Sequence, residues 1–178
     1  MGERPSQGPV ARVMTWAYER PVEELTIVHL RDWHDRSDPS QREHLERFGD
    51  HCLKDTPGAD FVFFNGEDRG AVHVVNSLTL NDFQNTELER LLAPFQERPT
   101  RIGLTGVWTE AKVYFLAYEL ITRYPHFQVA VCSALTASSS RIRHFEALQQ
   151  MERILGVRVI HSVGEFVDFL GGGELETP

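Results

Sequence analysis

The feature that most constrains the fold of this chain is a regular alternation of short apolar runs and longer amphipathic segments in its second half. The apolar runs have the length and near-continuous hydrophobicity of strands buried on both faces, and they span residues 102–105, 128–132 and 157–160. Each is followed by a segment of helical spacing, at residues 109–124, 140–155 and 163–170. This alternation predicts an α/β fold in which a mainly parallel sheet lies between two layers of helices.

The first half of the chain has the same kinds of element in a less regular order. Strands are predicted at residues 25–30, 61–64 and 72–75, and helices at residues 9–19, 41–48 and from about Thr86. Residues 1–8 are polar and rich in glycine and proline, so we predict a disordered N-terminus. Residues 9–170 then form a single domain, and residues 171–178 form a flexible tail.

Length and composition exclude several classes of protein. The 178 residues suffice for one domain with a full core, and 41% hydrophobic with 25% charged residues is typical of a globular protein. The net charge of −8 with scattered basic residues argues against nucleic-acid binding. No apolar run has the length of a membrane span, and the N-terminus does not resemble a signal peptide. Two cysteines, Cys52 and Cys132, make no disulfide framework, which fits a cytoplasmic protein.

Asp32, His34 and His51 form the first group of candidate functional residues. Asp32 and His34 follow the predicted strand at residues 25–30, and side chains two residues apart in an extended segment point the same way. Two imidazoles and a carboxylate suit a divalent ion such as Zn²⁺, Mn²⁺ or Fe²⁺. The spacing alone leaves a second interpretation open, in which Asp32 and His34 form loop hydrogen bonds and His51 ends a helix.

The second candidate site lies where the strand at residues 102–105 ends and the long helix begins. Many α/β enzymes place nucleophiles and anion-binding backbone groups at such a junction. The junction, residues 106–113, reads Gly-Val-Trp-Thr-Glu-Ala-Lys-Val and offers Lys112. A lysine in an apolar pocket can act as a base or nucleophile, whereas an ion pair with Glu110 or Asp32 would make Lys112 a structural residue.

Taken in order along the chain, these motifs resemble the isochorismatase-like cysteine hydrolases, in particular the nicotinamidases. The resemblance rests on Asp-Trp-His at residues 32–34, Asp-His-Cys at 50–52, Thr-Pro-Gly-Ala at 56–59 and the junction at 106–113. A later helix contributes the matching residues His144, Ala147 and Leu148. The resemblance covers residues 10–170 and implies the three-layer α/β/α fold of that family.

The catalytic positions of the family are changed in this chain. The family uses a cysteine, a lysine and an aspartate. The resemblance puts Lys112 at the cysteine and Ser77 at the lysine, or Asn76 if the register slips by one. The aspartate belongs to a first strand that has no counterpart here, Cys52 matches a non-catalytic position, and Cys132 ends a buried strand. The resemblance therefore implies a relative without cysteine hydrolase activity. The alternative is an active metal-dependent amide hydrolase of nicotinamidase type.

The same resemblance implies a metal and a small-molecule pocket. It assigns Asp32, His34 and His51 as ligands of an ion that receives a pyridine nitrogen. A further ligand would come from His44 or Glu43. The expected pocket walls are Trp33, Val107 and Trp108. The expected partner is a small molecule of nicotinamide type bound to a homo-oligomer, with no nucleotide cofactor, nucleic acid or membrane involved.

Two structural details of the family bear on how far the resemblance holds. In the family, the missing first strand lies between the strands that match residues 25–30 and 102–105. Its absence would leave those strands either paired directly or with unpaired edges, with lowered stability and a tendency to associate. The family also has a cis peptide bond at the turn that matches Val107-Trp108, which this chain has either kept or lost.

Overall fold

The structure is a computed structural model in which residues 8–63 and 72–172 are described. Most of the predicted disordered N-terminus and flexible tail, residues 1–7 and 173–178, lies outside these ranges, as does residue 64 of the strand predicted at 61–64. Within the described part, no helix is both long and apolar enough to cross a lipid bilayer.

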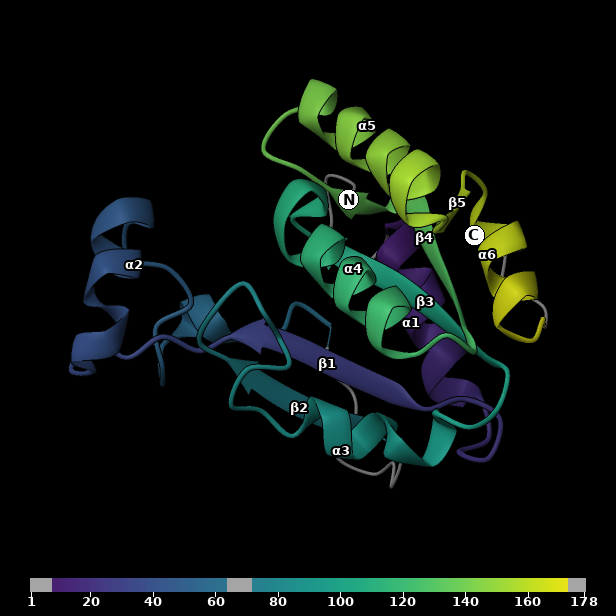
Figure 1. Cartoon of the computed structure of the whole chain (residues 1–178), viewed down its shortest axis with the longest axis horizontal. Coiled ribbons are helices and arrows are strands. Elements are labelled where there is room, and N and C mark those ends of the chain that lie inside the picture. Colours follow the sequence, from purple (N-terminus) through teal and green to yellow (C-terminus); the bar gives the residue numbers. More distant parts are fainter. Residues whose placement is uncertain (1–7, 64–71, 173–178) are drawn as a thin grey trace.

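The strands of the described residues form two parallel sheets. In the smaller sheet β1 (Ile27–Asp32) pairs with β2 (Val72–Ser77). In the larger sheet β4 (Phe127–Ala137) lies between β3 (Thr100–Val107) and β5 (Arg158–Ile160). Each of these pairings is parallel, so the predicted α/β class is confirmed (Figure 1). The register sets Asp32 opposite Ser77, at the carboxyl end of the smaller sheet.

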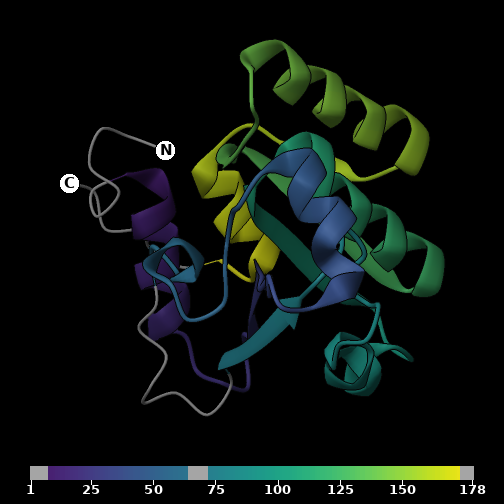
Figure 2. The same ribbon diagram turned by 90° about the vertical axis from the view of Figure 1, so that its left-hand side faces the viewer.

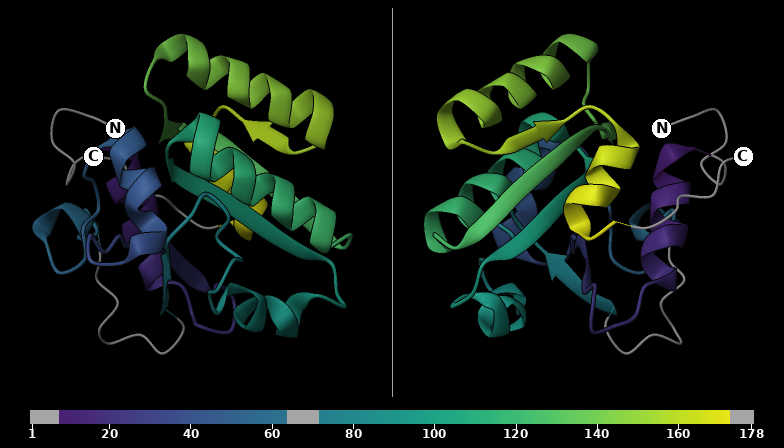
Figure 3. Two further views of the ribbon diagram at one scale, coloured as in Figure 1. Left: turned by 60° about the vertical axis from the view of Figure 1, so that its left-hand side comes forward. Right: turned by 90° about the vertical axis from the view of Figure 1, so that its right-hand side faces the viewer.

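Helices cover both faces of the larger sheet (Figure 3). On one face lie α4 (Tyr114–Arg123) and α5 (Arg141–Gln150), which are continuous with the π-helical turns η5 (Thr109–Val113) and η6 (Met151–Leu155). On the other face lie α1 (Pro9–Glu19) and α6 (Val163–Leu170). The shorter elements are α2 (Arg42–Phe48), α3 (Leu88–Leu92), η2 (Pro39–Gln41), η3 (Pro57–Ala59) and η4 (Ala93–Phe95). α2 lies beyond the carboxyl end of β1, nearest the viewer in Figure 2.

The alternation of side chains along β4 builds a separate core on each face of the larger sheet. Val129 and Val131 belong to a cluster with residues of α4, whereas Ala130 and Cys132 belong to a cluster with residues of α1 and α6. Cys132 is a free, fully buried thiol, in agreement with the packed cysteine that was predicted. Burial raises the pKa of this thiol and so disfavours the thiolate.

No strand pairing joins the smaller sheet to the larger one in residues 8–63 and 72–172. In this part of the chain, β1 pairs with β2 and β3 pairs with β4, but β1 and β3 do not pair with each other. Each of the two strands therefore has one edge without a strand partner. All six residues of β1 are only partly buried, although Val28 and Leu30 pack against one core and Ile27 packs against the other. Of the two outcomes expected for a missing first strand, the structure therefore shows unpaired edges and not direct pairing.

Two strand predictions differ from the structure. Residues 61–63 form no strand. The ring of Phe61 instead packs against His29 and lies 4.9 Å from the Arg31 guanidinium, so the described part of this apolar run covers side chains of β1. The strand predicted at residues 128–132 is longer than expected, because β4 shifts register and continues to pair with the end of β3 at Gly106 and Val107.

Candidate functional site

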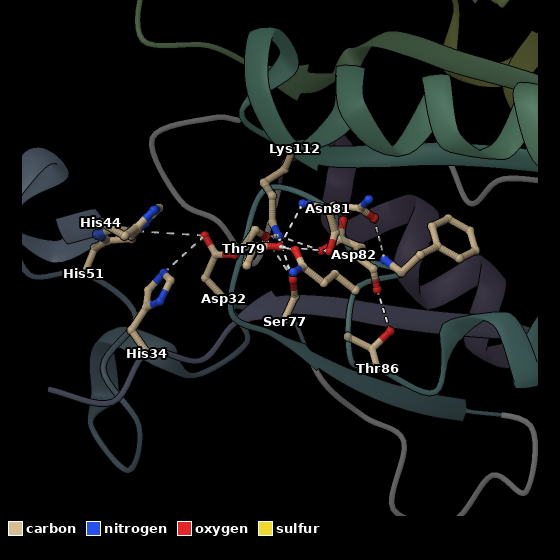
Figure 4. A network of polar contacts seen from close by, with 12 residues as sticks. Asp32, His34, His44, His51, Ser77, Thr79, Asn81, Asp82, Thr86 and Lys112 are labelled. Carbon is tan, nitrogen blue, oxygen red and sulfur yellow. Dashed lines mark hydrogen bonds and ion pairs between the residues drawn. The ribbon is translucent and has the colours of Figure 1, made fainter. Parts of the chain in front are cut away.

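Three histidines and one aspartate converge beyond the carboxyl end of β1. The Oδ2 atom of Asp32 lies 4.0 Å from Nε2 of His34 and 4.0 Å from Nε2 of His51. His44, on α2, places its Nε2 atom 3.4 Å from Nε2 of His51. Ligand atoms of the three histidines all lie within 4.8 Å of one another. Figure 4 shows the rings of these histidines on one side of the Asp32 carboxylate.

Backbone hydrogen bonds explain why residues far apart in the sequence meet here. The N–H of His34 donates to the carbonyl oxygen of Cys52 at 3.0 Å, and the N–H of Lys54 donates to the carbonyl oxygen of His34 at 2.8 Å. This short parallel bridge holds the segment after β1 beside the segment that carries His51. α2 lies between these two segments in the sequence and brings His44 to the same place.

Hydrogen bonds on the far side of two rings fix which nitrogen faces the cluster. Nδ1 of His51 donates to the carbonyl oxygen of Gly49 at 2.8 Å. Nδ1 of His34 lies 2.9 Å from Oε1 of Gln41, whose amide nitrogen donates to Asp38 at 3.0 Å, so the Gln41 oxygen must accept. In the neutral tautomer that these bonds select, Nδ1 carries the proton and the Nε2 that faces the cluster carries the lone pair, which is the arrangement that binds metals.

The cluster has the properties of a divalent metal site. Nε2 of His34 is buried and has no hydrogen-bond partner among the described residues, which is unfavourable unless a ligand such as a metal occupies the site. A tetrahedral ion with bonds of about 2.0–2.1 Å spaces its ligand nitrogens about 3.3–3.4 Å apart, close to the spacing of the His44 and His51 nitrogens. Burial lowers the pKa of His44, and the neighbouring histidines add to the effect, so the neutral ring is favoured.

Lys112 extends from the π-helical turn η5 to two carboxylates, that of Asp32 at the end of β1 and that of Asp82 in the segment after β2. Its Nζ atom lies 2.9 Å from Oδ1 of Asp32 and 2.6 Å from Oδ1 of Asp82. It also donates to Oγ of Ser77 at 3.1 Å and to the carbonyl oxygen of Thr79 at 2.5 Å (Figure 4). Of the two interpretations of this lysine, the geometry matches the ion pair, with Asp32 and not Glu110 as partner.

Asp82 is a site residue that the sequence interpretation missed. Its side chain is 2% exposed, and burial raises the pKa of its carboxyl group while the nearby Lys112 opposes that shift. The signal that could have found it was an acidic residue within an otherwise apolar and turn-forming run after β2. The serine at the position that matches the family's lysine, Ser77, carries no charge. Lys112 supplies the positive charge beside the carboxylates of Asp32 and Asp82 instead.

The predicted pocket walls occupy different positions around this network. Trp33 lies under the Arg31 guanidinium, whose carbon is 3.8 Å from the ring centroid. Val107 is the last residue of β3 and Trp108 precedes η5; these residues are 45% and 53% exposed. The peptide bond between Val107 and Trp108 is cis, so this chain has kept that feature of the family turn.

The serines that follow β4 contact Glu110, in the junction between β3 and the long helix. The Glu110 carboxylate accepts hydrogen bonds from the hydroxyls of Ser138 and Ser139 and from the N–H of Ser139. Burial opposes ionisation of Glu110, but these hydrogen bonds prevail and lower its pKa to about 2. Ser140 caps α5 by accepting from the N–H of Arg143, so these serines have structural partners.

The family to which the chain belongs follows from a comparison of sequences. The sequence profile described as the isochorismatase domain matches residues 6–162. The chain belongs to the isochorismatase family. Among curated proteins, none matches it.

Several solved structures have a fold similar to that of this chain. An isochorismatase-like hydrolase from Alkaliphilus metalliredigens has a TM-score of 0.74 and 22% identity, with 94% of this chain and 91% of that chain covered. A pyrazinamidase/nicotinamidase from Streptococcus mutans has a TM-score of 0.71 and 26% identity, with 88% and 87% covered. A pyrazinamidase of Pyrococcus horikoshii in complex with zinc has a TM-score of 0.71 and 22% identity, with 86% and 85% covered.

Proposed function

We propose that this protein is an isochorismatase-family member that binds a divalent ion and a small ligand at the end of β1 and has no cysteine hydrolase activity. The observation that carries the proposal is the place of Lys112. It stands where the family resemblance puts the attacking cysteine, and its ammonium group is engaged by Asp32 and Asp82. A charged lysine held by two carboxylates has no free electron pair with which to attack a substrate.

Neither cysteine of the chain is suited to replace the lost nucleophile. An attacking thiolate needs a cation or helix terminus that lowers its pKa. Burial raises the pKa of Cys52, and the Asp32 carboxylate raises it further. Cys132 is fully buried with a raised pKa. The chemistry of both thiols therefore supports the absence of cysteine-dependent turnover.

The donor set supports metal binding. The residues that would hold the ion are Asp32, His34, His44 and His51, three imidazoles and one carboxylate oxygen, a set typical of Zn²⁺ and related ions. A bound ion would supply a Lewis acid, and a nitrogen-containing ligand would join these four donors as a fifth. The likeness to nicotinamidases favours a ligand of nicotinamide type, with Trp33 and the exposed Val107 and Trp108 as its neighbours.

The decisive experiment is a nicotinamide hydrolysis assay on metal-loaded protein with and without iodoacetamide. We expect no iodoacetamide-sensitive turnover, and Cys52→Ala and Cys132→Ala variants should behave like the unaltered protein. Turnover that iodoacetamide abolishes, and that one of these variants also lacks, would contradict the proposal. Turnover that survives iodoacetamide but disappears with a chelator would instead support the alternative, a metal-dependent amide hydrolase.

The proposal includes a cytoplasmic homo-oligomer. The exposed aromatic side chains of Phe115 and Tyr118 on α4 and the unpaired edges of β1 and β3 are surfaces that association could cover. Light scattering over a range of concentrations tests this part separately. A mass that stays at 20.4 kDa at all concentrations would contradict the oligomer and leave the metal site unaffected.

A further inference from the structure

The two carboxylate oxygens of Asp32 lie in different surroundings. Oδ1 is 2.9 Å from the Lys112 ammonium nitrogen, whereas Oδ2 is 4.0 Å from Nε2 of both His34 and His51. Figure 4 shows the carboxylate between the lysine on one side and the histidines on the other. One oxygen is thus paired with a fixed cation, and the other is directed at the candidate metal position.

The lysine is held firmly enough to keep this arrangement. Besides Asp32, its ammonium nitrogen contacts Oγ of Ser77 at 3.1 Å, the carbonyl oxygen of Thr79 at 2.5 Å and Oδ1 of Asp82 at 2.6 Å. The three N–H donors are used by the hydrogen bonds to Ser77, Thr79 and Asp82, and the Asp32 oxygen faces the same nitrogen as an ion pair. The side chain is 14% exposed, which leaves it little room to swing away from Asp32.

We infer that Lys112 is a positioning residue that limits Asp32 to coordination through one oxygen and thereby sets which ion the site prefers. This inference rests on the proposed metal site. Three imidazoles and one carboxylate oxygen satisfy Zn²⁺ or Co²⁺ in a four-coordinate site. Mn²⁺ is better served by more oxygen ligands, and the lysine withholds the second oxygen of Asp32.

The ratio of two metal affinities separates this effect from simple charge. The positive charge of Lys112 repels every divalent ion, so its removal should change the affinities for Zn²⁺ and Mn²⁺ in the same direction. Release of Oδ1 of Asp32, in contrast, favours Mn²⁺ in particular. The ratio of the Zn²⁺ affinity to the Mn²⁺ affinity therefore reports on the number of oxygen ligands and not on the positive charge of Lys112.

The test compares the unaltered protein with two variants. Lys112→Met combined with Asp82→Asn removes the lysine without leaving the Asp82 charge buried alone. Asp82→Asn by itself is the matched control, because it keeps the contact between Lys112 and Asp32. Zn²⁺ and Mn²⁺ affinities are measured by competition with a chelator, the visible spectrum of bound Co²⁺ is recorded, and circular dichroism verifies that each protein is folded.

In the double variant, we expect the Zn²⁺-over-Mn²⁺ preference to fall by about tenfold, the lower end of the change in metal affinity that follows the loss of a ligand's partner. The strong absorption of four-coordinate Co²⁺ should weaken as the coordination number rises, and the control variant should keep both properties. An unchanged ratio and spectrum in the double variant would overturn the inference while the metal site stands. Equal shifts in both variants would also overturn it. An unaltered protein that binds none of these ions would overturn the proposed metal site itself.

Discussion

Lys112→Met should destabilise the protein because it leaves the Asp82 carboxylate buried without its cation. The Asp82 side chain is 2% exposed, and the lysine nitrogen is 2.6 Å from its Oδ1 atom. Removal of one partner of a buried ion pair costs about 3–5 kcal/mol, since the remaining charge must stay desolvated or take up a proton. Because the Asp32 side chain is 21% exposed and can turn toward water, we expect the lower end, about 3 kcal/mol.

Urea unfolding followed by circular dichroism at pH 7 measures this loss. A chelator is present throughout, because a bound ion would add its own stabilisation. With a slope of about 2 kcal/mol per molar urea, the midpoint should fall by about 1.5 M. Lys112→Met combined with Asp82→Asn should recover about 2 kcal/mol, because the two side chains contact each other. Lys54→Met, a change at the other, exposed lysine, is the control and should have little effect.

Two results would refute this reasoning. The first is a loss of less than about 1 kcal/mol for Lys112→Met, the size expected for an exposed pair. The second is additivity, in which the loss in the double variant equals the sum of the losses for Lys112→Met and Asp82→Asn. Either result would mean that the contact between Lys112 and Asp82 contributes less to the free energy of unfolding than its burial implies.

Two further predictions concern the packing around the site. The pKa of Glu110 is lowered from 4.5 to about 2, so its stabilising effect is present above pH 4.5 and is lost as the pH falls toward 2. When the free energy of unfolding is followed from pH 4.5 toward pH 2, it should therefore fall less in Glu110→Gln than in the unaltered protein. Equal decreases in the two proteins would contradict the stabilising role of the Glu110 hydrogen bonds. Gly103→Ala should lower the free energy of unfolding by about 1–3 kcal/mol, because its Cβ atom would lie 2.5 Å from Cζ of Phe166. Gly164→Ala, with 3.7 Å to its nearest neighbour, is the control for urea unfolding, and a similar loss in both variants would contradict the prediction.

The sequence predicted the elements of the larger sheet well because their hydrophobic patterns have strong periodicity. The helix predicted at residues 163–170 coincides with α6, whose first turn is capped by the Ser162 side chain. The strand predicted at 61–64 was wrong in its described part, because aromatic residues favour strands but Phe61 packs against side chains. No local pattern could show whether β1 and β3 pair, since that depends on how two distant segments dock.

The candidate site could be predicted only in part. Asp32 and His34 follow a strand and lie two residues apart, so their convergence was predictable from the chain geometry. The contribution of His44 could be stated only as one of two options, because it depends on how α2 packs against the segment after β1. The contact of Lys112 with Asp82 joins residues 30 positions apart, and no spacing rule covers such a pair.

Zinc anomalous scattering from crystals soaked in Zn²⁺ tests the central claim most directly. The account predicts one strong peak about 2.0–2.2 Å from Nε2 of the three histidines His34, His44 and His51 and from Oδ2 of Asp32. It also predicts that the Lys112 nitrogen stays in contact with Oδ1 of Asp32. A peak bound to Cys52, or zinc found elsewhere on the surface while these side chains remain without an ion, would contradict the account.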